Sequence, residues 1–225
     1  MFQTVLNYFL SLPVYFYTSL FVMTVVAVLS YVVGKRVERL DVRETPAKFY
    51  TVFIEFIGFF NGFVKGYIGK HWRFVAPLTL TMALYVFLSN ISGIIALDAP
   101  TKYTTITFSL SIISFIIVQV TGFISQSWRH FLGLFQPLPF MFPLNVISEF
   151  SPLISMALRL FGNIASGAVI LGLVYRATGV FSIIVAPPFH LIFDIGFGLI
   201  QTLVLVLLTV IFAANKVDEA DLDIV

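Results

Sequence analysis

The sequence predicts an all-α integral membrane protein, and three observations lead to this fold class. Hydrophobic residues make up 59% of the 225 residues, and charged residues only 11%. The mean hydropathy of +1.01 is far above that of soluble globular domains. The apolar residues also gather in runs long enough to cross a bilayer. We therefore expect about five membrane helices, the last two long and strongly tilted as a hairpin, plus an interfacial amphipathic helix.

The apolar runs define the expected segments of a single membrane domain, residues 1–225. No basic segment or cleavage site precedes the first run, so we expect it to be retained as a span. The last two runs are too long for an upright crossing and should tilt or lie partly along the membrane. The expected segments are a first span at 14–34, spans at 74–97 and 105–126, long tilted helices at 144–177 and 180–214, and an acidic tail at 215–225.

The distribution of basic residues predicts the topology. Eight of the 13 lysines and arginines lie between Lys35 and Arg73, directly after the first span. Basic segments between spans tend to stay on the cytoplasmic side, which places this segment inside. Five crossings then leave the N-terminus outside and the C-terminus inside. A bacterial plasma membrane fits this reading best, and an organellar energy-transducing membrane is the alternative.

The segment 46–70 has the pattern of an amphipathic helix. Polar and small residues recur at spacings of three and four, with phenylalanines filling the other side. We expect this helix to lie on the inner membrane interface, where it anchors the bundle. The alternative is contact with the membrane segment of a partner through the small-residue face.

Charged residues interrupt the last two apolar runs. Glu149, Arg159 and Asp194 lie within these runs, and Arg176 lies next to a predicted turn. A charge near the bilayer centre costs about 2.5 to 3.5 kcal/mol on insertion scales, so such residues usually mark a functional site. The simpler interpretation is a structural ion pair of Arg159 with Glu149 or Asp194.

The neighbours of these charges form two polar stripes. Ser155, Arg159 and Asn163 follow at four-residue spacing and stack on one helix face. In the last run, His190, Asp194 and Gln201 return near one direction at about 100° per residue. Two such stripes facing one another can hold water and relay protons, whereas stripes facing lipid would insert poorly.

Several motifs of the second half resemble one family. The run from Pro143 to Gly167 contains Leu-Arg-Leu-Phe-Gly-Asn at 158–163 and resembles the signature of subunit a of F-type ATP synthases. The segments 198–209 and 87–93 are similar to the last helix and to the end of the second span of that family. The resemblance covers most of the chain from about Phe53 onward.

The resemblance implies a role for each matching residue. Arg159 would be the stator arginine that meets the carboxylate of each rotor subunit, with Asn163 and Gln201 beside it. Asn90 and Glu149 would be polar residues associated with the half-channels. Ser155 is expected on the proton path from its place in the polar stripe of Arg159. Family members often carry glutamate or histidine nine residues after the arginine, where this chain has Ala168. We therefore expect Asp194 with His190 to supply the titratable relay.

The resemblance also implies partners. The last two helices would pack against the rotor c-ring, and the complex would include peripheral stalk b subunits, the F1 sector and membrane lipid. The chain lacks a Walker-type glycine loop, so nucleotide chemistry would belong to a soluble partner. We expect no cofactor, no metal and no nucleic acid.

Two other function classes fit parts of the sequence. A stand-alone ion channel or secondary transporter could use the same intramembrane charges, although the internal repeats of such transporters are not evident. An intramembrane metalloenzyme would need His71, His130 and His190 together, and these residues lack the spacing of a His-Glu-x-x-His motif. The sequence is compatible with either protons or sodium ions as the transported species.

Overall fold

The computed structural model describes residues 13–38, 48–93, 99–135 and 138–222. These residues form helices and short connections, without a strand, and this confirms the predicted all-α membrane class. Four helical stretches among them are long and apolar enough to cross a membrane, Val14–Glu38, Tyr50–Ile91, Thr104–Gln126 and Phe142–Ala214. The α-helices are α2 (Val14–Glu38), α3 (Lys48–Ile68), α4 (Trp72–Ile91), α5 (Thr104–Gln126), α6 (Arg129–Leu132), α7 (Phe142–Thr178), α8 (Ser182–His190), α9 (Phe197–Ala214) and α10 (Glu219–Leu222).

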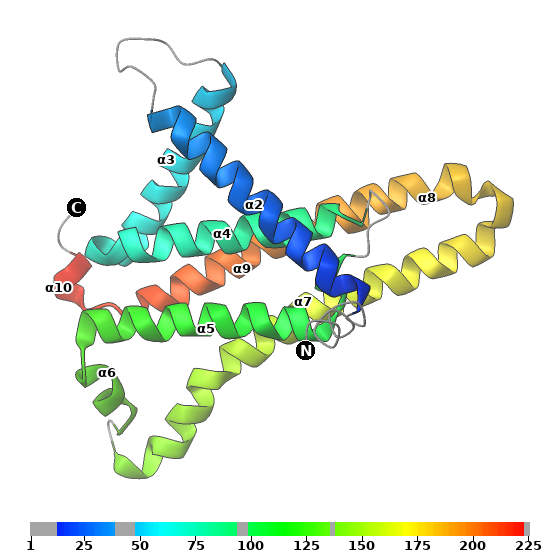
Figure 1. Cartoon of the computed structure of the whole chain (residues 1–225). Helices are drawn as coiled ribbons and strands as arrows, with labels where there is room; N and C mark the ends of the chain where they lie inside the picture. Colours follow the sequence, from blue (N-terminus) through cyan, green and yellow to red (C-terminus); the bar gives the residue numbers. More distant parts are fainter. Residues whose placement is uncertain (1–12, 39–47, 94–98, 136–137, 223–225) are drawn as a thin grey trace, which may run out of the picture.

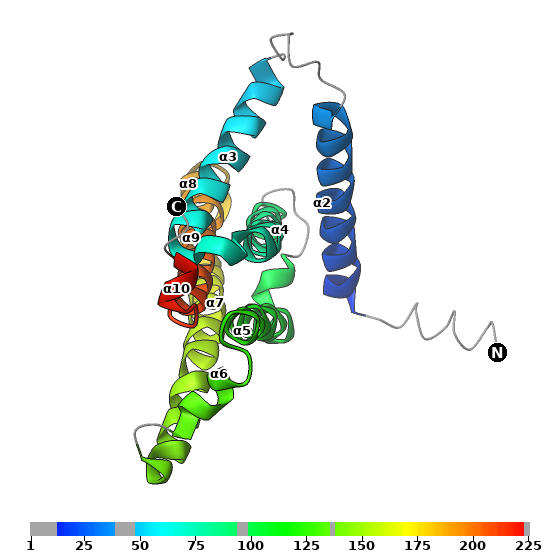
Figure 2. The ribbon, with the colours of Figure 1, turned by 90° about the vertical axis from the view of Figure 1, so that its left-hand side faces the viewer.

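The core lies where α9 packs against both α4 and α5 (Figure 1). Val75, Val86, Leu205 and Val210 are almost completely buried there. The hydroxyl groups of Ser114 and Thr209, 2.6 Å apart, add a hydrogen bond between α5 and α9. Such a bond satisfies polar groups that lipid could not solvate. Helix α2 stands to one side of this group (Figure 2), where Ser19 meets Tyr85 of α4 at 2.8 Å between hydroxyl oxygens.

Helix α7 crosses this group obliquely and projects beyond it at both ends (Figure 1). It has 37 residues, which at 1.5 Å per residue give a length of about 55 Å, well over the roughly 30 Å of a hydrocarbon core. At Gly179 the chain turns with a positive φ of 51°, a conformation that glycine adopts without strain. Helices α8 and α9 then return alongside α7, so the last two apolar runs form a hairpin.

The returning arm of the hairpin is not a continuous α-helix. Pro187 and Pro188 lie inside α8, and Leu191–Gly196 forms a π-helical segment between α8 and α9. Proline donates no backbone hydrogen bond, which disturbs the α-helical pattern around it. The stacking of His190 over Gln201 was derived from the 100° rotation of an α-helix, and a π-helix rotates less per residue. That derivation was therefore wrong for this stretch.

Helix α3 joins α4 almost directly through the short turn Gly69–His71. Its C-terminal half buries Phe60, Val64 and Ile68 against the core, while Glu55 and Lys65 remain exposed. Phe56 and Phe59 are exposed as well, so apolar side chains also lie outside the buried side of the helix. Its location on the inner interface stays a prediction.

The C-terminal tail is tied to the bundle through Asp221. The Asp221 carboxylate accepts hydrogen bonds from the hydroxyl of Ser125 at 2.6 Å and from Nε2 of His71 at 3.0 Å. Gly69 has a φ of 59°, and an added Cβ there would collide with the backbone carbonyl of Asp221. The tail, the start of α4 and the end of α5 therefore lie at one end of the molecule.

Acidification should release this tail. The hydrogen bond from Ser125, followed by that from His71, lowers the pKa of Asp221 below its ordinary value of 3.8. A carboxyl group with a lowered folded pKa stabilises the folded state above its unfolded pKa, and that contribution is lost as the pH falls through the folded pKa. We expect the backbone amides of residues 218–222 to keep their protection from hydrogen exchange down to about pH 4 and to lose it below.

Substitution of the same residue supplies the comparison at neutral pH. Asp221→Asn should exchange rapidly at pH 7, whereas Asp218→Asn, which changes an exposed carboxylate of the same tail, should remain protected. Equal protection of Asp221→Asn and the unmodified chain at pH 7 would show that the carboxylate does not hold the tail.

Candidate ion-conducting site

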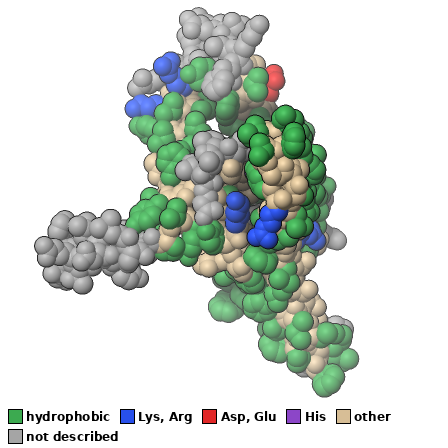
Figure 3. Space-filling model, turned by 90° about the vertical axis from the view of Figure 1, so that its right-hand side faces the viewer, with side chains coloured by type: hydrophobic (Ala, Val, Ile, Leu, Met, Phe, Trp, Pro, Cys, Tyr) green, Lys and Arg blue, Asp and Glu red, His purple; other side chains and the backbone are tan. Residues whose placement is uncertain are grey.

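Arg159 lies near the middle of α7 and is exposed. Large apolar side chains surround it on the helix surface, including Ile154 at 49% and Leu158 at 56% exposure. Within the described part of the chain, no hydrogen bond or ion pair involves its guanidinium group. Figure 3 shows one side of the molecule, where a few lysine and arginine side chains lie in a mainly hydrophobic surface. A charge on an apolar membrane face is costly, so Arg159 requires a partner there.

Glu149 does not supply that partner. Its carboxylate accepts hydrogen bonds from the ammonium group of Lys216 and, at 2.9 Å, from the side-chain amide of Gln119. The alternative interpretation of a structural pair between Arg159 and Glu149 is therefore wrong, because Lys216 at the end of the return helix neutralises Glu149. The alternative pair with Asp194 involves a side chain outside the described set.

Four of the predicted residues meet around one cavity, here called the Asn90 cavity. Asn90, Asn163, His190 and Gln201 line this space of about 60 Å³ between α4, α7 and the return arm of the hairpin. Lys102 and Ala168 line it as well. The polar residues of several helices therefore converge, although they are far apart in the sequence.

Hydrogen bonds fix the polar side chains of the Asn90 cavity. The hydroxyl of Thr101 donates to Oδ1 of Asn90 at 2.7 Å, and the amide of Asn163 donates to Oε1 of Gln201 at 2.7 Å. The hydroxyl of Tyr175 lies 2.8 Å from Nε2 of His190. Sequence reasoning missed Thr101 and Tyr175, because neither falls in a polar stripe.

Two glycines allow close packing at this cavity. A Cβ on Gly198 would lie 2.8 Å from Cβ of Asn90, closer than real side chains come. A Cβ on Gly167 would lie 3.3 Å from Cδ1 of Phe193. Small residues at these two positions therefore bring α4 and α7 close to the return arm.

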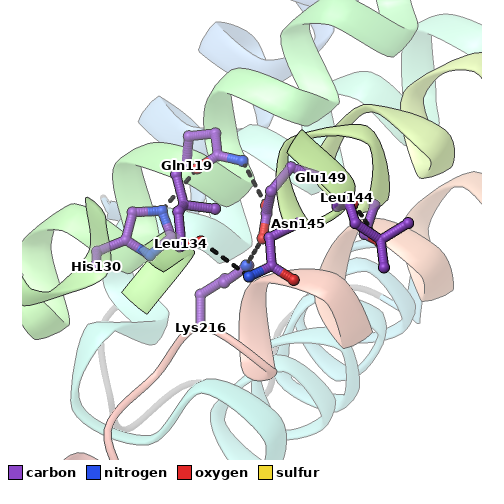
Figure 4. Close-up of polar contacts among 8 residues, drawn as sticks. Gln119, His130, Leu134, Leu144, Asn145, Glu149 and Lys216 are labelled. Atoms are coloured by element: carbon purple, nitrogen blue, oxygen red, sulfur yellow. Dashed lines mark hydrogen bonds and ion pairs between the residues drawn. The ribbon is translucent and has the colours of Figure 1, made fainter. Parts of the chain in front are cut away.

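A second space, here called the Glu149 cavity, lies between α5, α7 and the end of α9. Its volume is about 200 Å³, and Ser114, Gln119, Glu149 and Lys216 supply much of its polar lining. Figure 4 shows Lys216 and Gln119 pointing toward Glu149 from different elements. The space lies near the end of the molecule that carries the C-terminal tail, since Asn215 and Lys216 follow α9 directly.

His130 supports this cluster from the connection between α5 and α7. Its Nε2–H donates to Oε1 of Gln119 at 2.7 Å, so Gln119 bridges His130 and Glu149 (Figure 4). Burial, together with the positive charge of Lys216, lowers the pKa of His130, although Glu149 acts in the opposite direction. The neutral ring is therefore favoured, with its proton on Nε2.

Arg159 lies between the two cavities along α7. The α7 residues that line the Glu149 cavity end at Met156, and those that line the Asn90 cavity begin at Asn163. On α9 the same separation lies between Gln201 and Phe212. Arg159 and Ser155 themselves line neither space.

The metalloenzyme alternative finds no support in this geometry. Within the described residues, no group of three or more histidine, cysteine, aspartate or glutamate side chains is arranged to hold a metal ion. His71 contacts Asp221, His130 contacts Gln119 and His190 contacts Tyr175, at three separate places. The three histidines are thus engaged in unrelated hydrogen bonds.

The fold and the site define a class of protein, a helical membrane protein with charged and polar side chains within its long apolar helices. The model of the family "ATP synthase A chain" matches residues 16–214. The chain therefore belongs to the ATP synthase A chain family, as the resemblance of its arginine motif predicts.

Individual relatives agree with this assignment. ATP synthase subunit a of Helicobacter pylori strain 26695 is 34% identical over 210 residues, which cover 90% of each chain. ATP synthase subunit a of Moorella thermoacetica is 32% identical over 164 residues, 72% of this chain and 73% of the relative. The sodium ion specific subunit a of Propionigenium modestum is 36% identical over 132 residues, 56% of this chain and only 43% of the relative.

A double-mutant cycle on Glu149 and Lys216 should reveal coupling between the two side chains. Each single change, Glu149→Gln or Lys216→Met, leaves a half-buried charge without its partner and should lower the melting temperature of the purified chain in detergent. The loss of unfolding free energy in the double variant should be smaller than the sum of the two single losses. The difference, the coupling free energy, should be about 0.5 to 3 kcal/mol. Strictly additive losses would contradict a direct ion pair.

Proposed function

We propose that this chain is the ion-translocating stator subunit of a rotary ATP synthase and that Arg159 is its central charge. Membership of the ATP synthase A chain family supports the assignment to the membrane sector of that enzyme. The observation that carries the proposal is the exposed guanidinium of Arg159 on an apolar membrane face. A carboxylate on a rotor subunit is the natural partner for that group.

Arg159 acts electrostatically in this proposal. Arginine stays protonated at any accessible pH, so it does not carry the transported proton itself. A nearby positive charge favours the ionised form of a carboxyl group. Each rotor carboxyl group therefore releases its proton on approaching Arg159. Away from the stator it faces lipid, where only the neutral form is acceptable.

The two cavities would then serve as the two half-channels. The Glu149 cavity, next to the C-terminal tail, would open to the inside, and the Asn90 cavity to the outside. Each would connect one aqueous phase to a position beside Arg159, whose charge prevents a direct leak between them. Because a rotor carboxyl group must lose its proton to one cavity and regain it from the other, ion flow requires rotation.

His190 and Asp194 would complete the path on the Asn90 side. His190 lines the cavity and contacts Tyr175, and Asp194 follows one turn later in the π-helical segment. Such segments often occur at functional sites. The relay would take the place of the glutamate or histidine that other family members often have at the position of Ala168.

The exposed apolar surface of the hairpin is the expected contact with the rotor c-ring. It surrounds Arg159 and continues along α9, where the large exposed residues include Leu199, Ile200, Leu203 and Leu207. Peripheral stalk b subunits and the F1 sector would complete the complex in a bacterial plasma membrane. A stand-alone channel or transporter would leave Arg159 without a partner.

Removal of the central charge tests the function. Arg159→Ala should abolish ATP-driven acidification of sealed inverted vesicles that contain the assembled complex, because no charge then drives release of the rotor proton. Passive proton leak should stay unchanged or rise, since the barrier between the two cavities is removed. Both are measured with a pH-sensitive dye, and assembly is checked by blue native electrophoresis.

Arg176→Ala is the matched control. Arg176 is also exposed and lies on the same helix, but it lines neither cavity. This variant should retain pumping within about twofold of the unmodified complex. Full pumping by the assembled Arg159→Ala complex would refute the stator role and would indicate that Arg159 is a structural residue.

A further inference from the structure

Two buried amide nitrogens of the Asn90 cavity have no partner within the described part of the chain. They are Nδ2 of Asn90 and Nε2 of Gln201. The two residues are only 7% and 2% exposed, and both line the cavity. Buried N–H groups are almost always hydrogen-bonded, to protein or to ordered water. We therefore expect a hydrogen-bond acceptor inside the cavity for these two N–H donors.

The orientation of both amides is fixed by the bonds to their oxygen atoms. The Thr101 hydroxyl donates to the oxygen of Asn90, and the Asn163 amide donates to the oxygen of Gln201. A primary amide has one acceptor atom and one donor nitrogen. Since both oxygens are already bonded to protein donors, the nitrogens are the groups left to bind a ligand.

The chemistry of this lining selects its occupant. The two amide nitrogens offer only donors, and Lys102, which also lines the space, adds a positively charged donor. Asn163 also lines the space and adds one amide oxygen, but hard metal cations require several oxygen ligands. A cavity of about 60 Å³ has room for water and polar partners to hold it. The oxygen atom of water fits this arrangement, and a metal cation does not.

We propose that Thr101 is a positioning residue that holds the Asn90 amide with its N–H groups toward the cavity, which makes the cavity a binding site for water that excludes Na⁺. Thr101 is completely buried in the short turn Pro100–Lys102 and meets Asn90 across the end of α4. Gly198 allows Asn90 to stand against the return arm, next to Gln201. The role in transport rests on the proposed function, whereas the water site does not.

A high-resolution map of the assembled complex tests the site directly. We expect a water peak about 2.7 to 3.2 Å from Nδ2 of Asn90 and Nε2 of Gln201. Thr101→Ser keeps the hydroxyl and should keep this peak. Thr101→Val has a similar shape without the donor and should lose or displace it. An empty cavity in the unmodified complex, or an unchanged peak in Thr101→Val, would overturn the proposal.

The effect of Na⁺ on ATP synthesis tests whether the Asn90 cavity excludes Na⁺. In Thr101→Val the Asn90 amide is free to turn its oxygen toward the cavity, where it can join the Asn163 oxygen and water as ligands of a hard cation. ATP synthesis driven by an imposed pH gradient should then be about threefold or more slower with about 100 mM Na⁺ on the outer side than with the same concentration of choline. The unmodified complex and Thr101→Ser should show no such slowing.

Each result separates this proposal from the function of Arg159. Equal Na⁺ responses of Thr101→Val and Thr101→Ser would overturn the positioning role even if Arg159 proves essential. If Thr101→Val does not assemble, the Na⁺ experiment is carried out with Asn90→Asp instead. A carboxylate in the cavity should make ATP synthesis sensitive to Na⁺ in the same way. Insensitivity of Asn90→Asp would then overturn the exclusion of Na⁺. A water peak between the two amides would still support the water site if Arg159→Ala pumps normally.

Discussion

The positive charge of Arg159 on an apolar membrane face is the constraint on which the rest of the site depends. The chain neutralises its other intramembrane cluster internally, since Lys216 and Gln119 both bind Glu149. Arg159 lacks such a partner among the described residues, and the spaces on either side of it end before they reach it. A charge in this position is costly unless an acidic group pairs with it, and the proposed function assigns that role to a rotor carboxylate. In the proposed function, this pairing links the geometry of α7 to rotation.

The irregular return arm of the hairpin shapes the polar space on one side of this charge. Two prolines and a π-helical segment separate α8 from α9, and small residues at 167 and 198 let the neighbouring helices approach. His190 and Gln201 consequently reach one cavity without sharing one face of a regular helix. Because of this irregular segment, the return arm of a largely hydrophobic hairpin contributes polar side chains to one wall of the Asn90 cavity.

Hydropathy predicts the fold class well, because the absence of water dictates helices wherever the chain crosses lipid. The arginine motif and the polar stripes likewise predict that Asn163 and Gln201 lie together, and their amides do form a hydrogen bond. Local spacing could not reveal the partners contributed by distant segments. Thr101, Tyr175 and Lys216 contact Asn90, His190 and Glu149 from other elements, and only the tertiary fold brings them together. The π-helical segment was missed because period analysis assumes a constant rotation per residue.

The most direct test of the account is the side from which each cavity can be reached. The chain has no cysteine, so single substitutions give unambiguous labelling. Ala168→Cys lines the Asn90 cavity and Ser148→Cys lines the Glu149 cavity. With a membrane-impermeant thiol reagent, we expect Ala168→Cys to react only in right-side-out vesicles and Ser148→Cys only in inverted ones. Reaction of both from the same side would contradict two half-channels separated by Arg159.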